Sequence, residues 1–309
     1  MAGLGGGSHD TVTTQANFIP ELWSDEIKAA YKSNLVFANL VKQMSFVGKK
    51  GDTLHIPVPG RSVAHQKVAE TVVTLNTDTA GTLPINIDQH WEWSRVIEDI
   101  AEIQALASQR AFYTDDAGYA LSKKVDSLLA ALAGGFQGST AYSTAVIGSD
   151  GTTVWDGSAS TNTGNGASIT DAGIRRVIQT LDDNDVPLDN RVLVISPSEK
   201  NSLLGVDKFN SRDYVGDSMN VKTGQFGGVY GLDVYVTTNL DTVQADDSST
   251  NYKACVAMHR DAMVLATQLD VRTQAQYKQE YLGTLFTADT IFGYTEYRDE
   301  AGVAIIVPV

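Results

Sequence analysis

Apolar residues recur at two different spacings along this chain, and each spacing predicts a different kind of element. From Val96 to Ala133 they fall three or four residues apart, which predicts one helix roughly 55 Å long. Gly118 weakens the middle of this pattern, so we expect a kink near Asp115–Gly118. The pair Gly134–Gly135 then ends the helix. The pattern therefore predicts a long helix, kinked once, in the middle of the chain.

A period of two marks strands before this helix. Apolar residues alternate with polar ones over residues 54–58 and again from Thr82 to Trp93. Pro57 and Pro59 cannot donate to a strand ladder, so they confine the first strand to an edge or an extended ribbon. Residues 61–81, which are mostly polar, join the two strands. A connection of this length is longer than common loops and predicts a projecting or functional loop.

A helix and a strand are predicted in residues 170–197. Asp171 can cap the helix. The apolar residues of one helical face are Ile174, Val177, Ile178 and Leu181. An acidic turn follows, and Pro187 prevents the helix from continuing beyond it. The apolar run from Val192 to Ile195 is typical of a strand covered on both faces. This unit predicts a helix that packs on a buried strand.

The remaining pattern is dominated by strands and turns. Residues 137–169 are rich in Ser, Thr and Gly, with one hairpin signal over 144–155. The glycine-rich stretch Gly224–Gly231 leads into a strand, and from Lys253 onward the chain is rich in strand patterns. Because the strand clusters lie far apart in sequence, the predicted fold class is α+β with non-local pairing.

The first fifty residues have the pattern of an arm. Residues 1–16 are small and polar and are expected to be mobile. Large apolar side chains then fall on one helical face, at Phe18, Leu22, Trp23 and Ile27. Residues 35–46 are more continuously apolar and fit either a helix or an extended segment. Such an arm has no partner nearby in sequence, so we expect it to dock on the same subunit or on a neighbouring one.

Charge is distributed unevenly over the 309 residues, which carry a formal net charge of −14. Residues 1–50 hold five basic against four acidic residues, whereas residues 171–250 hold seven against 13. No basic stripe occurs, so tight electrostatic binding to a nucleic-acid backbone is not expected. The acidic balance fits simple solubility, and it equally fits a wall that encloses DNA without adhering to it.

The single cysteine, Cys255, excludes an intrachain disulfide and any zinc site built from several cysteines. Its apolar neighbours predict a place in a buried strand. No apolar stretch reaches the roughly 18–20 residues that span a bilayer, and the first 16 residues carry no secretory signal. These features are typical of a chain that folds in a reducing cytoplasm.

Several motifs suggest chemistry, and each fails on spacing. The acidic turn Asp182–Asp185 lacks the glycine and glutamate of a calcium loop, and Gly224–Gly231 precedes a strand instead of the helix of a dinucleotide site. Gly216–Ser218 echoes an esterase nucleophile, but His259 has no aspartate at the right distance. The five histidines are scattered without metal-ligand spacing. The sequence therefore predicts no catalytic residue, no cofactor and no metal site.

The order of these elements resembles the major capsid proteins of tailed bacteriophages, which have the Hong Kong 97-type fold. Residues 51–57 are similar to the family's entry into its extended loop, and the helix from Val96 to Ala133 takes the place of its spine helix. Residues 181–197 resemble the family's axial unit, and 228–234 its return strand. Phe292–Ile305 resembles its closing hairpin.

The resemblance implies a division of the chain along the lines of that fold. It comprises an N-terminal arm (1–50), an extended loop with flanking strands (51–95), the spine helix of a peripheral domain (96–136), an axial domain (137–252) and a β-rich return to both domains (253–309). No long scaffolding segment precedes the arm, so any scaffold is expected to be a separate protein.

The function implied by the resemblance is structural and not enzymatic. It is a virion shell subunit that assembles as hexamers and pentamers around double-stranded DNA in the cytoplasm of a bacterial host, without specific DNA binding. Scaffold, portal and cement proteins are the partners it implies, and a membrane is not. The expected subunit contacts are Phe18, Leu22, Trp23, Ile27, Arg61 and Lys67. Some members cross-link neighbours through a Lys–Asn bond, and that chemistry is not carried over to Lys67.

Two alternatives differ in function. An encapsulin-type compartment shell has the same fold but loads protein cargo, and the long arm and loop favour the phage shell over it. A soluble enzyme with an unrecognised site belongs to another class. Electron microscopy of particles separates the three.

Overall fold

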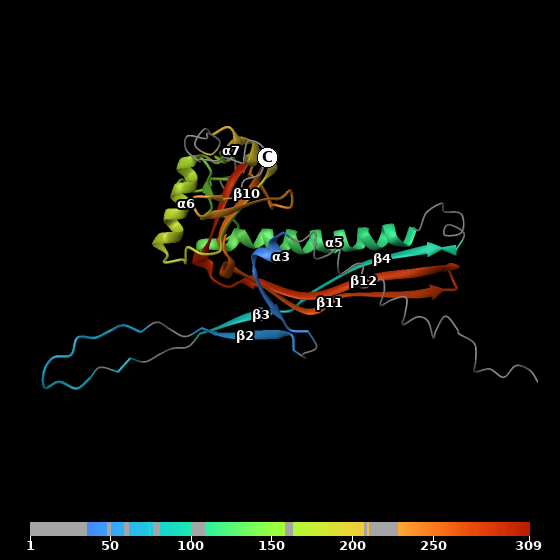
Figure 1. The fold of residues 1–309 in the computed structure, drawn as a ribbon, viewed down its shortest axis with the longest axis horizontal. Helices are drawn as coiled ribbons and strands as arrows, with labels where there is room; N and C mark the ends of the chain where they lie inside the picture. Colours follow the sequence, from blue (N-terminus) through green and yellow to red (C-terminus); the bar gives the residue numbers. More distant parts are fainter. Residues whose placement is uncertain are drawn as a thin grey trace, which may run out of the picture.

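The computed structural model describes residues 36–47, 51–58, 62–73, 75–76, 81–99, 109–157, 163–206, 209 and 228–309. The arm residues Phe18, Leu22, Trp23 and Ile27, and Arg61 of the loop, lie outside the described residues. Within them the chain forms two larger sheets, a two-stranded ribbon and one long helix (Figure 1). The mixture of helices and non-local strands confirms the α+β class.

We call the four-stranded sheet the blade sheet. Its strands, in spatial order, are β1 (Lys42–Ser45), β11 (Met263–Lys278), β12 (Gly283–Glu296) and β4 (Gln89–Glu98). β1 pairs parallel to β11, and the other pairs are antiparallel. Helix α5 (Gln109–Ala131) runs along one face of this sheet (Figure 1).

Apolar side chains hold α5 on the blade sheet. Ala117 and Leu121 of the helix are buried together with Phe286 and Ala288 of β12. The ring of Trp93 on β4 meets that of Phe286 edge-on, with 5.9 Å between the ring centroids. Burial of each large apolar side chain contributes about 1.5–3 kcal/mol, so this face accounts for the position of the helix.

The predicted helix is wrong at its start. Val96 lies in β4, where it pairs with Leu285. Ile97 is buried in the strand, so the apolar spacing that suggested a helix there also fits the end of a strand. The kink expected at Asp115–Gly118 does not interrupt α5, in which Ala117 and Leu121 pack against the sheet.

The second sheet, which we call the core sheet, has seven strands. They are β5 (Val146–Ile147), β13 (Gly302–Pro308), β10 (Asn251–His259), β6 (Arg191–Ile195), β8 (Leu232–Val236), β7 (Gly228–Val229) and β9 (Thr242–Gln244), which pairs with β10. Every residue of β6 is buried, as predicted for a strand covered on both faces. Cys255 of β10 is also buried, as expected.

Two helices flank the core sheet: α6 (Asp171–Asp183) and α7 (Pro197–Leu204) (Figure 1). The predicted face of α6 is confirmed, because Ile174, Val177 and Leu181 are buried. The predicted cap is off by one residue. Thr170 Oγ1, and not Asp171, accepts a hydrogen bond from the Gly173 N–H at 3.2 Å. Asp171 lies in the first turn, 3.2 Å from the guanidinium of Arg175.

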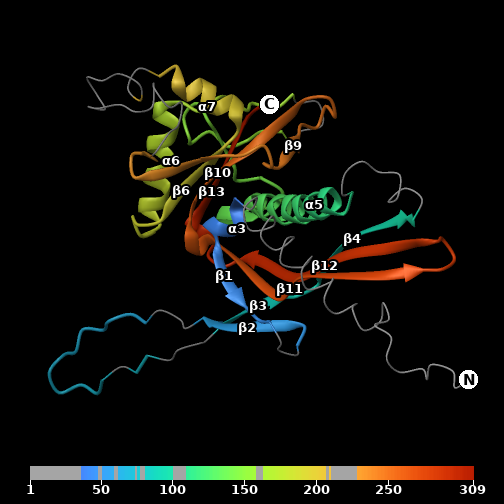
Figure 2. The same ribbon diagram turned by 45° about the vertical axis from the view of Figure 1, so that its right-hand side comes forward.

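Two strands pass directly from one sheet to the other. β10 continues into β11 through the 3-10 helix η2 (Arg260–Ala262), and β12 continues into β13 through η3 (Asp299–Ala301) (Figure 2). The predicted closing hairpin is therefore wrong, because β12 and β13 belong to different sheets. Tyr297 N–H donates to the Ala262 carbonyl at 2.8 Å, which joins the two crossovers.

The predicted hairpin over residues 144–155 is reduced to one bridge between Val146 and Val154. Most of the pairing of β5 is parallel to β13 instead, because Ile305 and Ile306 offer a buried apolar neighbour. The turn itself is held by Asp150, whose carboxylate accepts the N–H groups of Thr152 and Thr153.

The strands on either side of the long loop form an antiparallel ribbon, β2 (Thr53–Val58) and β3 (Gly81–Asn86). The single strand predicted from Thr82 to Trp93 is wrong in its extent, because β3 ends at Asn86 and the chain then enters β4 of the blade sheet. Both of its strands are edges, which explains how Pro57 fits there. Ile85 is buried with Val264 and Ala266 of β11, so one end of the ribbon rests on the blade sheet.

Residues 35–46 were expected as a helix or an extended segment, and the described part forms both. Helix α3 (Phe37–Leu40) packs beside α5, and β1 follows it (Figure 2). Phe37 and Val41 are fully buried in the subunit's own core. In the described part of the chain, no helix is long and apolar enough to cross a membrane.

Candidate functional site

The connection between β2 and β3 presents several strongly exposed apolar side chains to solvent. It extends beyond the ribbon and away from both sheets (Figure 1). Five of its side chains form what we call the loop patch: Val63 (70% exposed), Val68 (62%), Val72 (92%), Val73 (58%) and Leu75 (82%). Apolar side chains gathered on one projecting segment are typical of an interaction surface.

Hydrogen bonds order the loop without covering the patch. His65 Nε2 lies 2.8 Å from Asn76 Oδ1, and Asn76 Nδ2 donates to the Val63 carbonyl at 2.9 Å. Thr71 Oγ1 donates to the Val68 carbonyl at 2.7 Å. The two sides of the loop are therefore joined while their valines remain in solvent.

Lys67, one of the two predicted loop contacts, lies in this loop and is exposed. The contacts predicted for this loop were its charged residues Arg61 and Lys67, and the apolar loop patch was not predicted as a contact. The signal was present, because β-branched valines recur in a stretch that is otherwise polar.

An acidic cleft of about 750 Å³ lies at the far end of the ribbon, next to Val58. Its charged lining residues are Asp183, Asp185, Arg298, Asp299 and Glu300. The Gly138 N–H donates to Asp299 Oδ2 at 2.6 Å, and in the described part of the chain Asp299 Oδ1 is buried without a hydrogen-bond partner.

Burial, and then the charge of Asp299, raise the pKa of the neighbouring Glu296. The carboxylates that surround the η3 crossover therefore repel one another. Arg298 contributes one positive charge to the same lining. The cleft is consequently acidic in balance and offers no arrangement of a nucleophile with a base.

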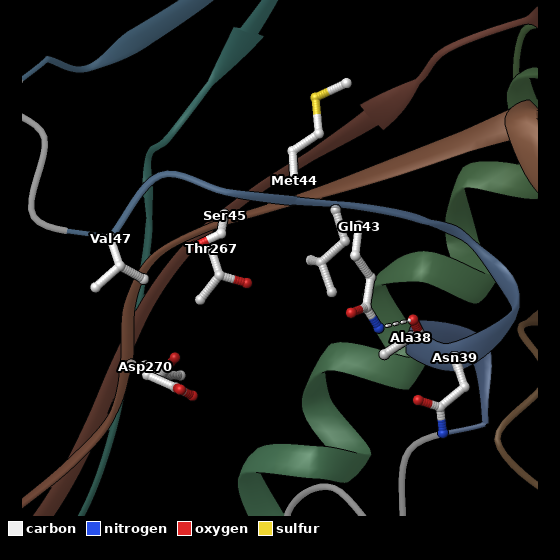
Figure 3. A pocket seen from close by; sticks show the side chains of 10 residues that line it. Ala38, Asn39, Gln43, Met44, Ser45, Val47, Thr267 and Asp270 are labelled. Carbon is white, nitrogen blue, oxygen red and sulfur yellow. Dashed lines mark hydrogen bonds between the residues drawn. The ribbon is translucent and has the colours of Figure 1, made fainter.

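A smaller cavity of about 340 Å³ lies between the α3–β1 segment and the start of β11 (Figure 3). Gln43 turns back and donates from Nε2 to the Ala38 carbonyl (Figure 3). Asp270 is the one ionisable residue in the described lining. This composition offers no catalytic pair.

The acidic turn has a structural role. Arg191 Nη1 lies 2.7 Å from Asp182 Oδ1, and Arg191 Nε donates to the Pro187 carbonyl at 2.8 Å. One carboxylate of the turn therefore holds β6 against the end of α6.

The other candidate chemical groups are also satisfied by neighbours. Although burial opposes it, hydrogen bonds from Arg272 and His90 hold the pKa of Asp289 below its usual value. Burial raises the pKa of Cys255 to about 12, so its thiol stays protonated. No group of three or more His, Cys, Asp or Glu that could hold a metal occurs among the described residues. Gly216–Ser218 lies outside them.

One buried carboxylate was missed by sequence reasoning. Asp126 of α5 is fully buried, and its oxygens accept the N–H groups of Val36 (3.3 Å) and Phe37 (3.2 Å). Burial raises its pKa, while these donors and Asn239 oppose the shift. The signal was an aspartate one residue after the apolar Val125, on the face of the helix that packs.

Comparison with known proteins points to one family. A family model described as "Phage capsid protein" matches residues 20–307. No curated protein matches the chain.

Solved structures are similar over most of the chain. The structure titled "Mycobacterium phage Che8" is 21% identical with a TM-score of 0.69, and the match covers 88% of this chain and 90% of that one. The capsid of Cyanophage P-SCSP1u is 18% identical with a TM-score of 0.68, and the match covers 88% of each chain. A virus-like particle from Pyrococcus furiosus is 12% identical with a TM-score of 0.53, and the match covers 93% of this chain and 99% of that one. These likenesses establish the Hong Kong 97-type fold.

Proposed function

Because this chain belongs to the phage capsid protein family, we propose that it assembles as hexamers and pentamers into an icosahedral shell that encloses double-stranded phage DNA. The family makes the protein a structural subunit of a virion shell. The loop patch supports assembly into hexamers and pentamers, and the acidic charge of the chain supports enclosure of DNA. Family and fold also point away from an enzyme.

The loop patch is the observation that carries the proposal. Burying a side chain such as Val72 or Leu75 contributes about 1.5–3 kcal/mol, and both are more than four-fifths exposed in the single subunit. A heterologous contact repeated around a ring buries the same patch on every subunit. Assembly therefore gives a physical reason for apolar side chains on a projecting loop.

The proposed subunit contacts comprise the loop patch together with residues predicted from sequence. The latter are Phe18, Leu22, Trp23 and Ile27 of the arm, and Arg61 and Lys67 of the loop. Exposed ion pairs contribute only about 0–1 kcal/mol each, so we expect the apolar contacts to dominate.

The domain division is part of the same proposal. The arm comprises residues 1–50, the extended loop and its flanking strands 51–95, the spine-helix part 96–136, the axial domain 137–252 and the return 253–309. Helix α5 lies within the third part, although β4 also reaches into its first residues.

The charge of the chain supports enclosure of DNA without specific binding. The net charge of −14 leaves few groups to pair with phosphates. We place assembly in the cytoplasm of a bacterial host, with separate scaffold, portal and cement proteins as the expected partners.

A compartment shell of the encapsulin type is a second candidate. The fold is compatible with it, since the match to a structure titled as a virus-like particle from Pyrococcus furiosus covers 93% of this chain. The two candidates differ in cargo and not in subunit fold. Their contents therefore distinguish them.

The test is expression of the full chain, alone and with its scaffold, followed by light scattering and electron microscopy. Closed megadalton particles are expected. Nuclease-protected DNA inside them supports the phage shell, whereas a protein cargo supports the compartment. A stable monomer under every condition would contradict both.

A further inference from the structure

Residues 36–47, which comprise α3 and β1, lie at the junction of the two sheets, and we call them the strap (Figure 2). Three connections cross this junction. They are the end of α5, the η2 crossover and the η3 crossover. The strap contacts all three.

The first contact is a helix cap supplied from a distance. Val36, the N-cap residue of α3, offers no side-chain hydrogen bond to the first turn. Asp126 supplies it instead, because Oδ1 and Oδ2 accept the Val36 N–H at 3.3 Å and Oδ1 accepts the Phe37 N–H at 3.2 Å. Free N–H groups at a helix start need such an acceptor.

Asp126 also joins a third element to the strap. Asn239, between β8 and β9, hydrogen-bonds to the same carboxylate. Because Asp126 is fully buried, loss of the strap would leave its oxygens short of donors in a dry site. The strap and the core sheet therefore meet at one carboxylate.

The second and third contacts share one ammonium group. Lys42 Nζ lies 3.9 Å from Asp261 Oδ1, in η2. It also lies 4.1 Å from the centroid of the Tyr297 ring, at the entrance to η3. Lys42 pairs in register with Val264, at the start of β11. One side chain of the strap thus touches both crossovers.

From these contacts we infer that the strap is a clamp that couples the end of α5 to the two crossovers between the blade sheet and the core sheet. Its α3 end is held by Asp126, and its β1 end holds the two crossovers through Lys42. Loosening either end is expected to loosen the other, because the strap is a short continuous segment. This inference concerns the single subunit and does not depend on shell assembly.

Hydrogen exchange on unassembled full-length subunits tests the clamp. Asp126→Asn removes the charged acceptor and is expected to speed exchange of the strap amides about tenfold, as expected from loss of a charged hydrogen bond. The clamp further predicts faster exchange at the amides of Tyr297 and Arg298, which Asp126 does not touch. Lys42→Met is expected to speed exchange at Val36 and Phe37.

Two matched variants control for the chemistry of each change. Asp116→Asn alters an exposed carboxylate of the same helix, and Lys278→Met alters a lysine at the far end of β11. Neither is expected to change exchange in the strap or at the crossovers.

Increased exchange confined to the neighbours of each substituted residue would overturn the clamp, because the contacts would then act independently. Unchanged strap exchange in Asp126→Asn would also overturn it. If Asp126→Asn loses protection throughout β10 and β13, Lys42→Met decides alone, since Lys42 is one-third exposed and Met preserves its apolar stem.

Discussion

Arg191 and Asp182 form an ion pair in which one partner is buried and the other is half exposed. Nη1 and Oδ1 are 2.7 Å apart, and the side chains are 2% and 49% exposed, respectively. Arg191 also donates to the carbonyls of Pro187 and Val186. The guanidinium therefore stabilises the turn between α6 and β6 through hydrogen bonds to the backbone as well as through its ion pair.

We expect Arg191→Leu to lower the free energy of unfolding by about 2–4 kcal/mol, because the buried carbonyl of Val186 and the partly buried carbonyl contact of Pro187 lose their donor. Asp182→Asn should cost less than about 1 kcal/mol, since its carboxylate is half solvated. Urea denaturation of the unassembled subunit measures both. Equal costs would show that the ion pair, and not the carbonyl contacts, stabilises the turn.

Val72→Asp is expected to prevent assembly while changing the free energy of unfolding by less than about 0.5 kcal/mol, because Val72 is 92% exposed in the subunit. Sedimentation of particles and urea denaturation provide the two readouts. Gln66→Asp places the same charge at an exposed polar position of the same loop and should assemble more efficiently. Comparable assembly of the two variants would exclude the loop patch as a contact.

Charge reversal by Arg61→Glu and Lys67→Glu should slow assembly more than it affects folding. Each exposed pair contributes about 0–1 kcal/mol, so the loss should be smaller than for Val72→Asp and should shrink as salt is raised. Light scattering against ionic strength measures it. The intersubunit role is contradicted if monomer stability falls as much as assembly does.

Deleting residues 1–33 should leave a folded subunit that assembles poorly, because the strap begins at Val36 and stays intact. Phe37→Ala should instead destabilise the subunit by about 3–5 kcal/mol, since Phe37 is fully buried. Thermal unfolding followed by circular dichroism compares the two. Unfolding of the truncated subunit would show that the arm belongs to its own core.

Stability should depend on pH through Glu199, a buried residue whose carboxylate accepts the Ile169 N–H at 2.6 Å. Burial raises its pKa above the usual 4.5, so ionisation is harder in the folded state. The contribution of Glu199 to the free energy of unfolding is therefore fully present below pH 4.5, and it is lost as the pH rises through the raised pKa.

Glu199→Gln, which removes this ionisation, should flatten that part of the pH profile. Urea denaturation between about pH 4 and 7 is the measurement. Glu300→Gln, at an exposed position, is the control and should leave the Glu199 component in place. An unchanged profile in Glu199→Gln would assign the dependence to another group.

Local periodicity was sufficient for elements whose partners are close in sequence. The buried face of α6, the fully buried strand β6 and the alternating strands β2 and β3 all follow the predicted patterns. The start of the long helix could not be found this way. Ile97 satisfies both periods, and pairing of β4 with β12, nearly two hundred residues later, decided between them.

The candidate contact residues likewise include some that local sequence indicated and some that depend on distant parts of the chain. The sequence marked residues 61–81 as a projecting loop, but exposure of Val72 depends on what surrounds it in space. The role of Asp126 depends on Val36, 90 residues earlier. Neither relationship leaves a periodic signal.

The sequence by itself determined the order and type of most elements, the absence of spaced chemical motifs and the family. Only the tertiary structure decided which sheet each strand joins, that β12 and β13 separate at η3, and that the strap packs on its own subunit. The physical reason is that helix and strand periods arise from neighbouring residues. Strand pairing and burial depend on contacts between distant residues, whose closure costs entropy that only the complete packed core offsets.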